Sequence, residues 1–254
     1  GTWRASDDEA ADAVTAALDV GYRHIDTAAV YRNEAGVGRA IAAHDVPRDE
    51  VFVTTKVWND AIRAGADEVQ RAVDASLDRL GFEQVDLVLL HWAVGDYVDA
   101  WAGLEAAYDA GKARAIGVSN FMVEHLEHLL QRARVAPMVN QVEFHPYLVQ
   151  PELLRFCREQ GIQHEAWAPL MQGRVMDVAE VRRVAEAHGK TPAQVAIRWC
   201  LQRGSVTIPK SVHRARIEQN ADVFDFELTT EQMQALDALD RNERVGPDPR
   251  DVTF

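Results

Sequence analysis

Short apolar runs alternate with amphipathic segments along the chain. The runs are rich in valine and isoleucine and stay apolar at successive positions, which is typical of strands buried on both faces of a parallel sheet. We expect eight strands, at residues 22–26, 51–57, 85–92, 113–120, 138–144, 162–167, 205–210 and 223–228.

Between these runs, apolar residues recur at the spacing of a helix with one buried face. In the segment 67–80, for example, Val69, Val73, Leu77 and Leu80 fall on one face. The clearest helices are expected at 67–80, 98–110, 123–133, 151–160 and 229–239.

The glycine pair in EAGVGRAIA, residues 34–42, resembles part of a dinucleotide fingerprint. That fingerprint needs a third glycine and a strand directly before it, and both are missing here. We therefore interpret this segment as a helix with small residues at close packing positions.

The alternation of strands and helices predicts an α/β fold. Eight strand-helix units in 254 residues favour a single-domain (β/α)8 TIM barrel. An open, doubly wound sheet is the structural alternative. No long linker or low-complexity tract divides the chain.

The net charge of -13 disfavours a general nucleic-acid binder, which would be basic. No apolar run approaches the length of a membrane span. The two cysteines lack a metal-ligand spacing, and His125 and His128 have no evident third ligand, so no metal is expected. A cytoplasmic protein without nucleic-acid or membrane partners is the simplest interpretation.

Polar side chains stand at the ends of several expected strands, where barrel enzymes carry their functional groups. Asp26 ends the first strand and Tyr31 follows it, Lys56 lies in the second strand, and His91 ends the third. Alone, an aspartate here would be a turn former and a lysine would extend to solvent. Together, the four side chains form a candidate acid/base set.

The chemistry of this set suits protonation of a carbonyl oxygen as hydride reaches its carbon. The pKa of a tyrosine is about 10, too high for efficient proton transfer at neutral pH. We expect the Lys56 ammonium to lower the pKa of Tyr31, and Asp26 to supply the counter-charge that a buried lysine needs. His91 would orient the carbonyl.

A second cluster is basic. Between residues 203 and 220 stand Arg203, Lys210, Arg214 and Arg216 against a single acid. Such cations near a helix start can bind phosphate, although a solvated basic face is the alternative.

Tryptophans supply the third candidate feature. Trp167 ends an expected strand and would stack on a flat ring, while Trp3, Trp58 and Trp92 would form an aromatic wall of an apolar pocket. Ordinary core packing is the alternative for each of them.

Several long segments resemble one family, the aldo-keto reductases, over essentially the whole chain. They include GYRHIDTAAVYRNEAGVG, TTKVWND, SLDRLGFEQVDLVLLHW, GKARAIGVSNF, VNQVEFHPY and IPKSVHRARIEQN. Within that family the chain is most similar to bacterial 2,5-diketo-gluconate reductases and prostaglandin F synthase-like members.

The resemblance implies an NADPH-dependent reductase of small carbonyl compounds, with Tyr31 as general acid and Asp26, Lys56 and His91 completing a tetrad. Trp3, Trp58, His91 and Trp92 would line the substrate pocket. The cofactor would be held by Thr27, Ser119, Asn120, Gln141, Trp167, Ala168, Leu170, Gln172, Gly173, Lys210, Ser211, Val212, Arg216, Gln219 and Asn220.

Within that set, the resemblance gives each group a part of the cofactor. Ser119, Asn120 and Gln141 would hold the nicotinamide carboxamide and Trp167 would stack on the ring. Leu170, Gln172 and Gly173 would line the pyrophosphate. The 2′-phosphate would be held by Lys210, Ser211 and Arg216, and the adenine by Gln219 and Asn220.

The chain also departs from the family pattern. Trp167 and Gln219 stand where tyrosine and glutamate are common, and Ala93 replaces a usual proline. The family's N-terminal hairpin would precede Gly1, and a monomer is typical of relatives. Two other functions are alternatives to a carbonyl reductase. One is a Schiff-base enzyme that uses Lys56, and the other is a regulatory barrel that binds the cofactor with little turnover.

Overall fold

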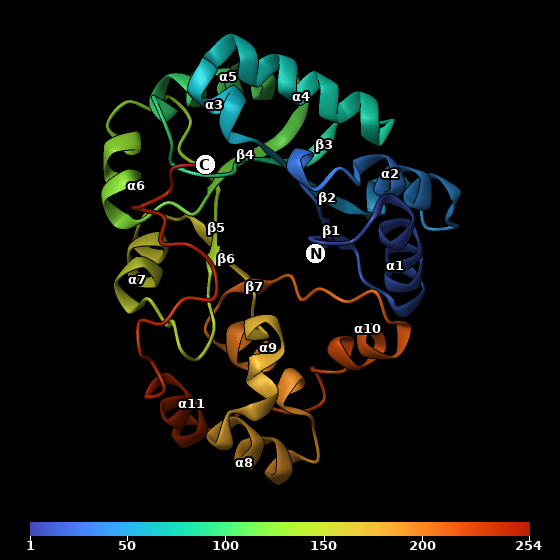
Figure 1. Ribbon diagram of the computed structural model, residues 1–254, viewed down its shortest axis with the longest axis vertical. Coiled ribbons are helices and arrows are strands. Elements are labelled where there is room, and N and C mark those ends of the chain that lie inside the picture. Colours follow the sequence, from blue (N-terminus) through green and yellow to red (C-terminus); the bar gives the residue numbers. More distant parts are fainter.

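Seven parallel strands curl around a common centre in a computed structural model that describes residues 1–254, and the helices lie outside them (Figure 1). The strands are β1 (His24–Asp26), β2 (Phe52–Val57), β3 (Val85–Leu90), β4 (Ala113–Ser119), β5 (Val139–Glu143), β6 (Gln163–Trp167) and β7 (Val206–Thr207).

Helices lie between the strands and at both ends of the series. They are α1 (Asp7–Val20), α2 (Glu34–Ala43), α3 (Asn59–Ala64), α4 (Ala66–Leu80), α5 (Tyr97–Asp109), α6 (Val123–Leu130), α7 (Pro151–Glu159), α8 (Ala179–His188), α9 (Pro192–Gln202), α10 (Arg214–Ala221) and α11 (Thr230–Asp237). Three short 3-10 segments are η1 (Ala29–Tyr31), η2 (Arg48–Glu50) and η3 (Met171–Asp177).

The strand order is β1-β2-β3-β4-β5-β6-β7, without a reversal. A doubly wound sheet reverses its order at a switch point, so that alternative is wrong and the α/β barrel is confirmed. The first residues of the chain lie between the two edge strands. The Gly1 amino group donates to the Pro209 carbonyl at 3.3 Å, and the Thr2 hydroxyl donates to the Asp26 carbonyl at 3.0 Å.

The strand expected at 223–228 is wrong, because this segment lies outside the sheet. Its alternating apolar residues are typical of a half-buried strand. However, side chains of α9 form hydrogen bonds with its backbone groups. Gln202 binds both the amide and the carbonyl of Leu228, and Arg198 donates to the carbonyl of Val223. Phe224 is left 76% exposed.

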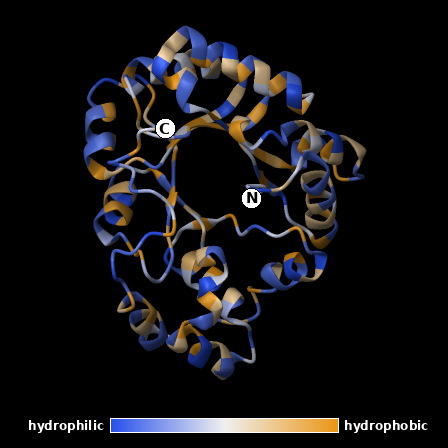
Figure 2. Cartoon of the chain, in the orientation of Figure 1, coloured by the Kyte–Doolittle hydropathy of each residue, from blue (hydrophilic) through white to orange (hydrophobic).

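The core lies between the sheet and the apolar faces of the helices, and Figure 2 shows orange strands inside helices of mixed colour. The buried face of α4 contains Val69, Val73, Leu77 and Leu80, as expected. No helix combines the length and apolar composition that a membrane crossing requires.

The glycines of α2 serve close packing, as expected. A β-carbon on Gly38 would lie 2.0 Å from the carbonyl oxygen of Leu80, and one on Gly36 would lie 2.0 Å from that of Asp7. These contacts let α2 approach α4 and α1 at backbone distance.

Candidate active site

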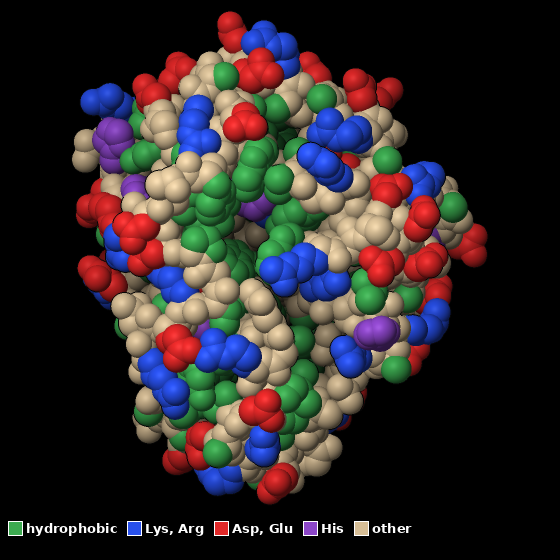
Figure 3. Space-filling model, viewed as in Figure 1, with side chains coloured by type: hydrophobic (Ala, Val, Ile, Leu, Met, Phe, Trp, Pro, Cys, Tyr) green, Lys and Arg blue, Asp and Glu red, His purple; other side chains and the backbone are tan.

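A cavity of about 1130 Å³ opens at the C-terminal ends of the strands, and Figure 3 shows a hollow with apolar walls at the centre of the viewed face. It brings together residues that are far apart in sequence. Its walls include Trp3, Asp26, Tyr31, Trp58, His91, Trp92, Ser119, Asn120, Gln141, Trp167, Ala168, Leu170, Gln172, Gly173, Lys210, Ser211, Arg216, Gln219 and Asn220.

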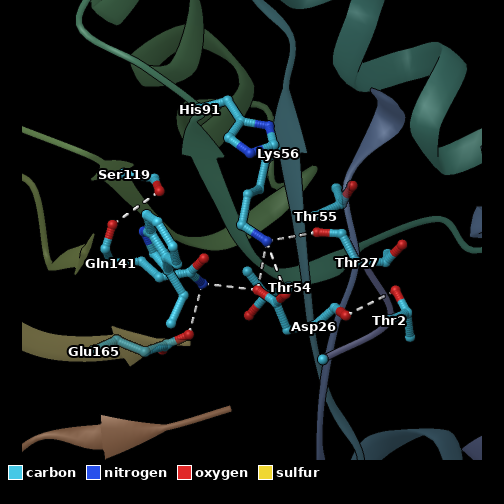
Figure 4. Close-up of polar contacts among 12 residues, drawn as sticks. Thr2, Asp26, Thr27, Thr54, Thr55, Lys56, His91, Ser119, Gln141 and Glu165 are labelled. Carbon is cyan, nitrogen blue, oxygen red and sulfur yellow. Dashed lines mark hydrogen bonds and ion pairs between the residues drawn. The ribbon is translucent and has the colours of Figure 1, made fainter. Parts of the chain in front are cut away.

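Asp26, which lines the cavity, forms a buried ion pair with Lys56 (Figure 4). Asp26 pairs in register with Thr54, and Lys56 lies two residues further along β2, so Lys56 points to the same face of the sheet as Thr54. Its ammonium donates to both Asp26 carboxylate oxygens, at 2.8 and 2.7 Å, and to the Thr27 carbonyl at 2.9 Å. These hydrogen bonds and the opposite charge of Asp26 thus compensate the cost of burying the Lys56 ammonium.

Tyr31 ends the short segment η1, and the chain turns there through Arg32 in the left-handed region, with φ 58°. Two buried side chains anchor the residues that follow. Asn33 donates to the carbonyls of Thr2 and Ala5, at 2.9 and 3.0 Å. Glu34 accepts from the Thr55 hydroxyl at 2.5 Å. The turn therefore holds the tyrosine ring in place, with its centroid 5.1 Å from the Lys56 ammonium.

The pKa of Tyr31 is raised, not lowered as the sequence led us to expect. Burial raises it, and the nearby Lys56 ammonium opposes this without reversing it. For Lys56 the opposite holds, because burial lowers its pKa but Asp26 and Tyr31 outweigh burial and raise it. Both groups are therefore protonated at neutral pH.

His91 is neutral, because burial, and to a lesser degree Lys56, lowers its pKa well below 6.5. Its ring meets that of Tyr31 edge to face, with centroids 5.8 Å apart, and that of Trp58 at 5.1 Å. Its Nδ1 is buried without a hydrogen-bond partner. The imidazole thus borders the tyrosine on the side of the aromatic wall.

Polar side chains at the ends of β4 and β5 form the next part of the wall. The Ser119 hydroxyl donates to the Gln141 carbonyl at 2.8 Å, and the Asn120 amide donates to the His91 carbonyl at 3.0 Å. The Trp167 indole donates to Asn120 Oδ1 at 2.8 Å, which fixes the tilt of its ring. Hydrogen bonds thus connect Gln141, Ser119, Asn120 and the Trp167 indole into one surface.

Two of the four cations in the basic cluster at residues 203–220 line the cavity. Arg203 and Arg214 are ion-paired elsewhere, Arg203 with Asp237 and Arg214 with Asp19. Lys210 and Arg216 line the cavity, and no carboxylate lies within ion-pair distance of either. In a chain with an excess of acids, two unpaired cations at one end of a cavity point to an anionic ligand.

Two predicted cofactor residues do not line the cavity. The Thr27 hydroxyl is buried and donates to Asn33 Oδ1 at 2.7 Å. Val212 packs against the hydrophobic core instead.

Other wall residues were not expected, because nothing in their local sequence marks them. They include Arg4, Pro169, Met176, Ile208, Val245, Gly246, Pro247 and Phe254. The tail is brought here by Glu143, whose carboxylate accepts from the amides of Val245 and Gly246 at 2.5 and 3.1 Å. Phe254 stacks on Trp58 with ring centroids 5.9 Å apart.

Comparisons with known proteins place this site in context. Residues 1–241 match the Aldo/keto reductase family. The chain is 53% identical to the glyoxal reductase of Bacillus subtilis (strain 168) over 247 residues, which cover 97% of this chain and 89% of the relative.

Solved structures agree with the sequence relatives. An aldo-keto reductase enzyme, MGS-M4, from a Medee basin deep-sea metagenome library has a TM-score of 0.97 and 42% identity, covering 100% of this chain and 94% of its own. A mutant of Gox0644 in complex with NADPH has a TM-score of 0.94 and 42% identity, covering 100% and 93%. With the barrel, the strand-end acid/base set and these matches together, the chain belongs to the aldo/keto reductase family.

Proposed function

We propose that this protein is an NADPH-dependent carbonyl reductase in which Tyr31 is the general acid. One observation supports this above the others. Tyr31, Lys56, Asp26 and His91 converge beside a cavity that also carries two unpaired cations. The acid/base set and the anion site therefore border the same cavity, so a cofactor held by its phosphate and a carbonyl substrate beside Tyr31 can bind together.

The cavity suits a nicotinamide dinucleotide phosphate. It exceeds the roughly 300 to 1,000 Å³ of common ligand pockets. Trp167 offers a fixed aromatic face near the tetrad, with Ser119 and Asn120 beside it. Lys210 and Arg216 would hold the 2′-phosphate. When bound, the reduced cofactor supplies the hydride that reduces a carbonyl carbon.

The residues of the chain would supply the proton. Because the pKa of Tyr31 is raised, its hydroxyl is present in the form that can donate to the carbonyl oxygen. The Lys56 ammonium stabilises the negative charge that then develops on the phenol oxygen, and Asp26 keeps that ammonium charged. Neutral His91 has one N–H with which to orient the carbonyl.

The substrate side of the cavity is aromatic, with the ring of Phe254 packed against those of both Trp58 and Trp92. Such a wall suits small aldehydes and ketones with a flat or apolar body. Similarity to a glyoxal reductase supports the inclusion of small dicarbonyl compounds.

The decisive experiment follows NADPH oxidation with glyoxal, methylglyoxal, diketones, sugars and aromatic aldehydes, with NADH in parallel. We expect turnover with at least one class, and a loss of roughly 10²- to 10⁴-fold in kcat for Tyr31→Phe, since that is the usual contribution of a general acid. The dissociation constant of NADPH should stay unchanged.

Two outcomes would contradict the proposal. Full turnover by Tyr31→Phe would refute the role of the tyrosine. Tight NADPH binding without turnover on any substrate would instead indicate a cofactor-binding regulatory barrel.

A further inference from the structure

A second carboxyl, Glu165, lies inside the barrel next to the ion pair and takes no part in the acid/base set (Figure 4). It belongs to β6 and pairs in register with Gln141 on β5. Its side chain is 2% exposed, and its Oε1 accepts a hydrogen bond from Gln141 Nε2 at 2.7 Å.

The same nitrogen also serves Asp26. Gln141 Nε2 donates to Asp26 Oδ2 at 2.7 Å, so both of its N–H groups are engaged by carboxyl groups. The Asp26 carboxylate, which is paired with Lys56, only accepts hydrogen bonds, so the amide nitrogen of Gln141 must face it, and the same nitrogen reaches Glu165. The amide oxygen therefore points the other way and forms no hydrogen bond within the protein, although Gln141 lines the cavity.

This arrangement is costly for a residue that merely fills space. Placing a carboxyl in the interior is unfavourable unless hydrogen bonds compensate it. Burial and the neighbouring Asp26 raise the pKa of Glu165 accordingly. Other buried positions of the same sheet carry apolar side chains, such as Leu87 and Leu89.

We propose that Glu165 is a positioning residue, which holds the Gln141 amide so that its oxygen accepts a hydrogen bond from the carboxamide N–H of the nicotinamide. This inference rests on the proposed function, because it concerns the same cofactor. Without an acceptor at position 165, one N–H of Gln141 is left unpaired inside the barrel. The amide then keeps only its hydrogen bond to Asp26 and can turn about that single bond, so its oxygen is no longer held in the direction of the carboxamide.

The test compares the dissociation constants of NADP⁺ and its acetylpyridine analogue, in which a methyl group replaces the carboxamide NH2. Tryptophan fluorescence of the full chain measures both. The wild-type protein should bind NADP⁺ roughly tenfold more tightly, the usual effect of one lost hydrogen bond. In Glu165→Met this preference should fall to about twofold or less. Glu165→Gln keeps an acceptor oxygen and should restore the wild-type preference.

Asp86→Asn is the matched control, since Asp86 is an equally buried carboxyl that binds Arg114 and the Val53 amide, away from the cavity. It should leave the preference unchanged. If Glu165→Met does not fold, Glu165→Ala removes the acceptor in a smaller side chain.

The outcomes separate the two proposals. Two results would overturn the role of Glu165 while leaving carbonyl reduction intact. One is a wild-type protein that binds NADP⁺ and the acetylpyridine analogue equally well. The other is a full preference for NADP⁺ in Glu165→Met or Glu165→Ala. Failure of the wild-type protein to bind NADP⁺ would overturn the proposed function and this inference with it.

Discussion

Lys56 and Asp26 lie on neighbouring strands and share a bidentate ion pair with no exposed surface at the lysine side chain. Stability alone does not require such a pair, since well-packed apolar residues of similar volume often replace a buried ion pair without loss of stability. Under the proposed function, its position beside Tyr31 gives the pair a chemical role.

Removal of one partner should leave the other as an uncompensated buried charge. We expect Lys56→Met to lose turnover and to lower the free energy of unfolding by about 3 to 5 kcal/mol. The double variant Lys56→Met with Asp26→Asn should recover much of the stability but none of the turnover. Urea unfolding and NADPH oxidation measure the two effects. Equal instability of the single and double variants would contradict a direct pairing.

The two unpaired cations should select the phosphorylated cofactor. Arg216→Ala should weaken NADPH binding roughly 10- to 100-fold, the value of a charge-assisted contact, and affect NADH far less. Lys210→Ala should act in the same direction. Arg214→Ala is the control, because this arginine is engaged by Asp19 and Glu218. Equal losses for NADPH and NADH would show that these cations do not contact the 2′-phosphate.

Buried histidines should make the protein sensitive to acid. Burial lowers the pKa of His164 to about 4, from 6.5 in the unfolded chain. Between these values the unfolded state binds more protons, so stability is full above pH 6.5 and falls as the pH drops. His164 alone accounts for about 3 kcal/mol by pH 4, since each pH unit is worth about 1.4 kcal/mol.

Replacement of this histidine should therefore flatten the pH dependence. Urea unfolding of His164→Asn at several pH values should show the smaller loss on acidification, whatever its stability at pH 7. His213→Asn, at an exposed position, should keep the wild-type slope. An unchanged slope in His164→Asn would contradict the prediction.

Gly246 brings the tail against the aromatic face of the cavity. A β-carbon at this position would lie 2.5 Å from the Trp167 ring and 3.2 Å from Glu143 Oε2. We expect Gly246→Ala to displace either the tail or the ring, to weaken NADPH binding several-fold and to cost about 1 to 3 kcal/mol of stability. Pro247→Ala alters the same tail without adding a β-carbon. Unaltered tryptophan fluorescence and binding in Gly246→Ala would show that the ring tolerates the contact.

Local patterns were sufficient for most elements of the fold. The runs that became β1 to β7 are recognisable because most of them are short and rich in valine, isoleucine or leucine, and that property can be read from a few adjacent residues. The segment 223–228 also resembles a strand locally, through its alternating apolar residues, but is not one, because α9 satisfies its backbone groups. Only a contact distant in sequence distinguishes the two cases.

The acid/base set was visible in the sequence for a related reason. Asp26, Lys56 and His91 interrupt apolar strands near their ends, and parallel strands bring such ends together at one face of a barrel. Glu165 interrupts a strand in the same way, but the sequence does not mark it as a functional residue. The role of an acid inside the barrel depends on which side chains of other strands lie beside it. The bond of Glu165 to Gln141 joins two different strands.

Sequence alone thus determined the residue types, the periodicity and the family resemblance. Only the tertiary structure decided which cations remain unpaired, which residues of the tail enclose the cavity, and whether burial or Lys56 controls the pKa of Tyr31. These properties depend on distances and on the exclusion of water, which arise when remote segments pack together. No local pattern encodes either quantity.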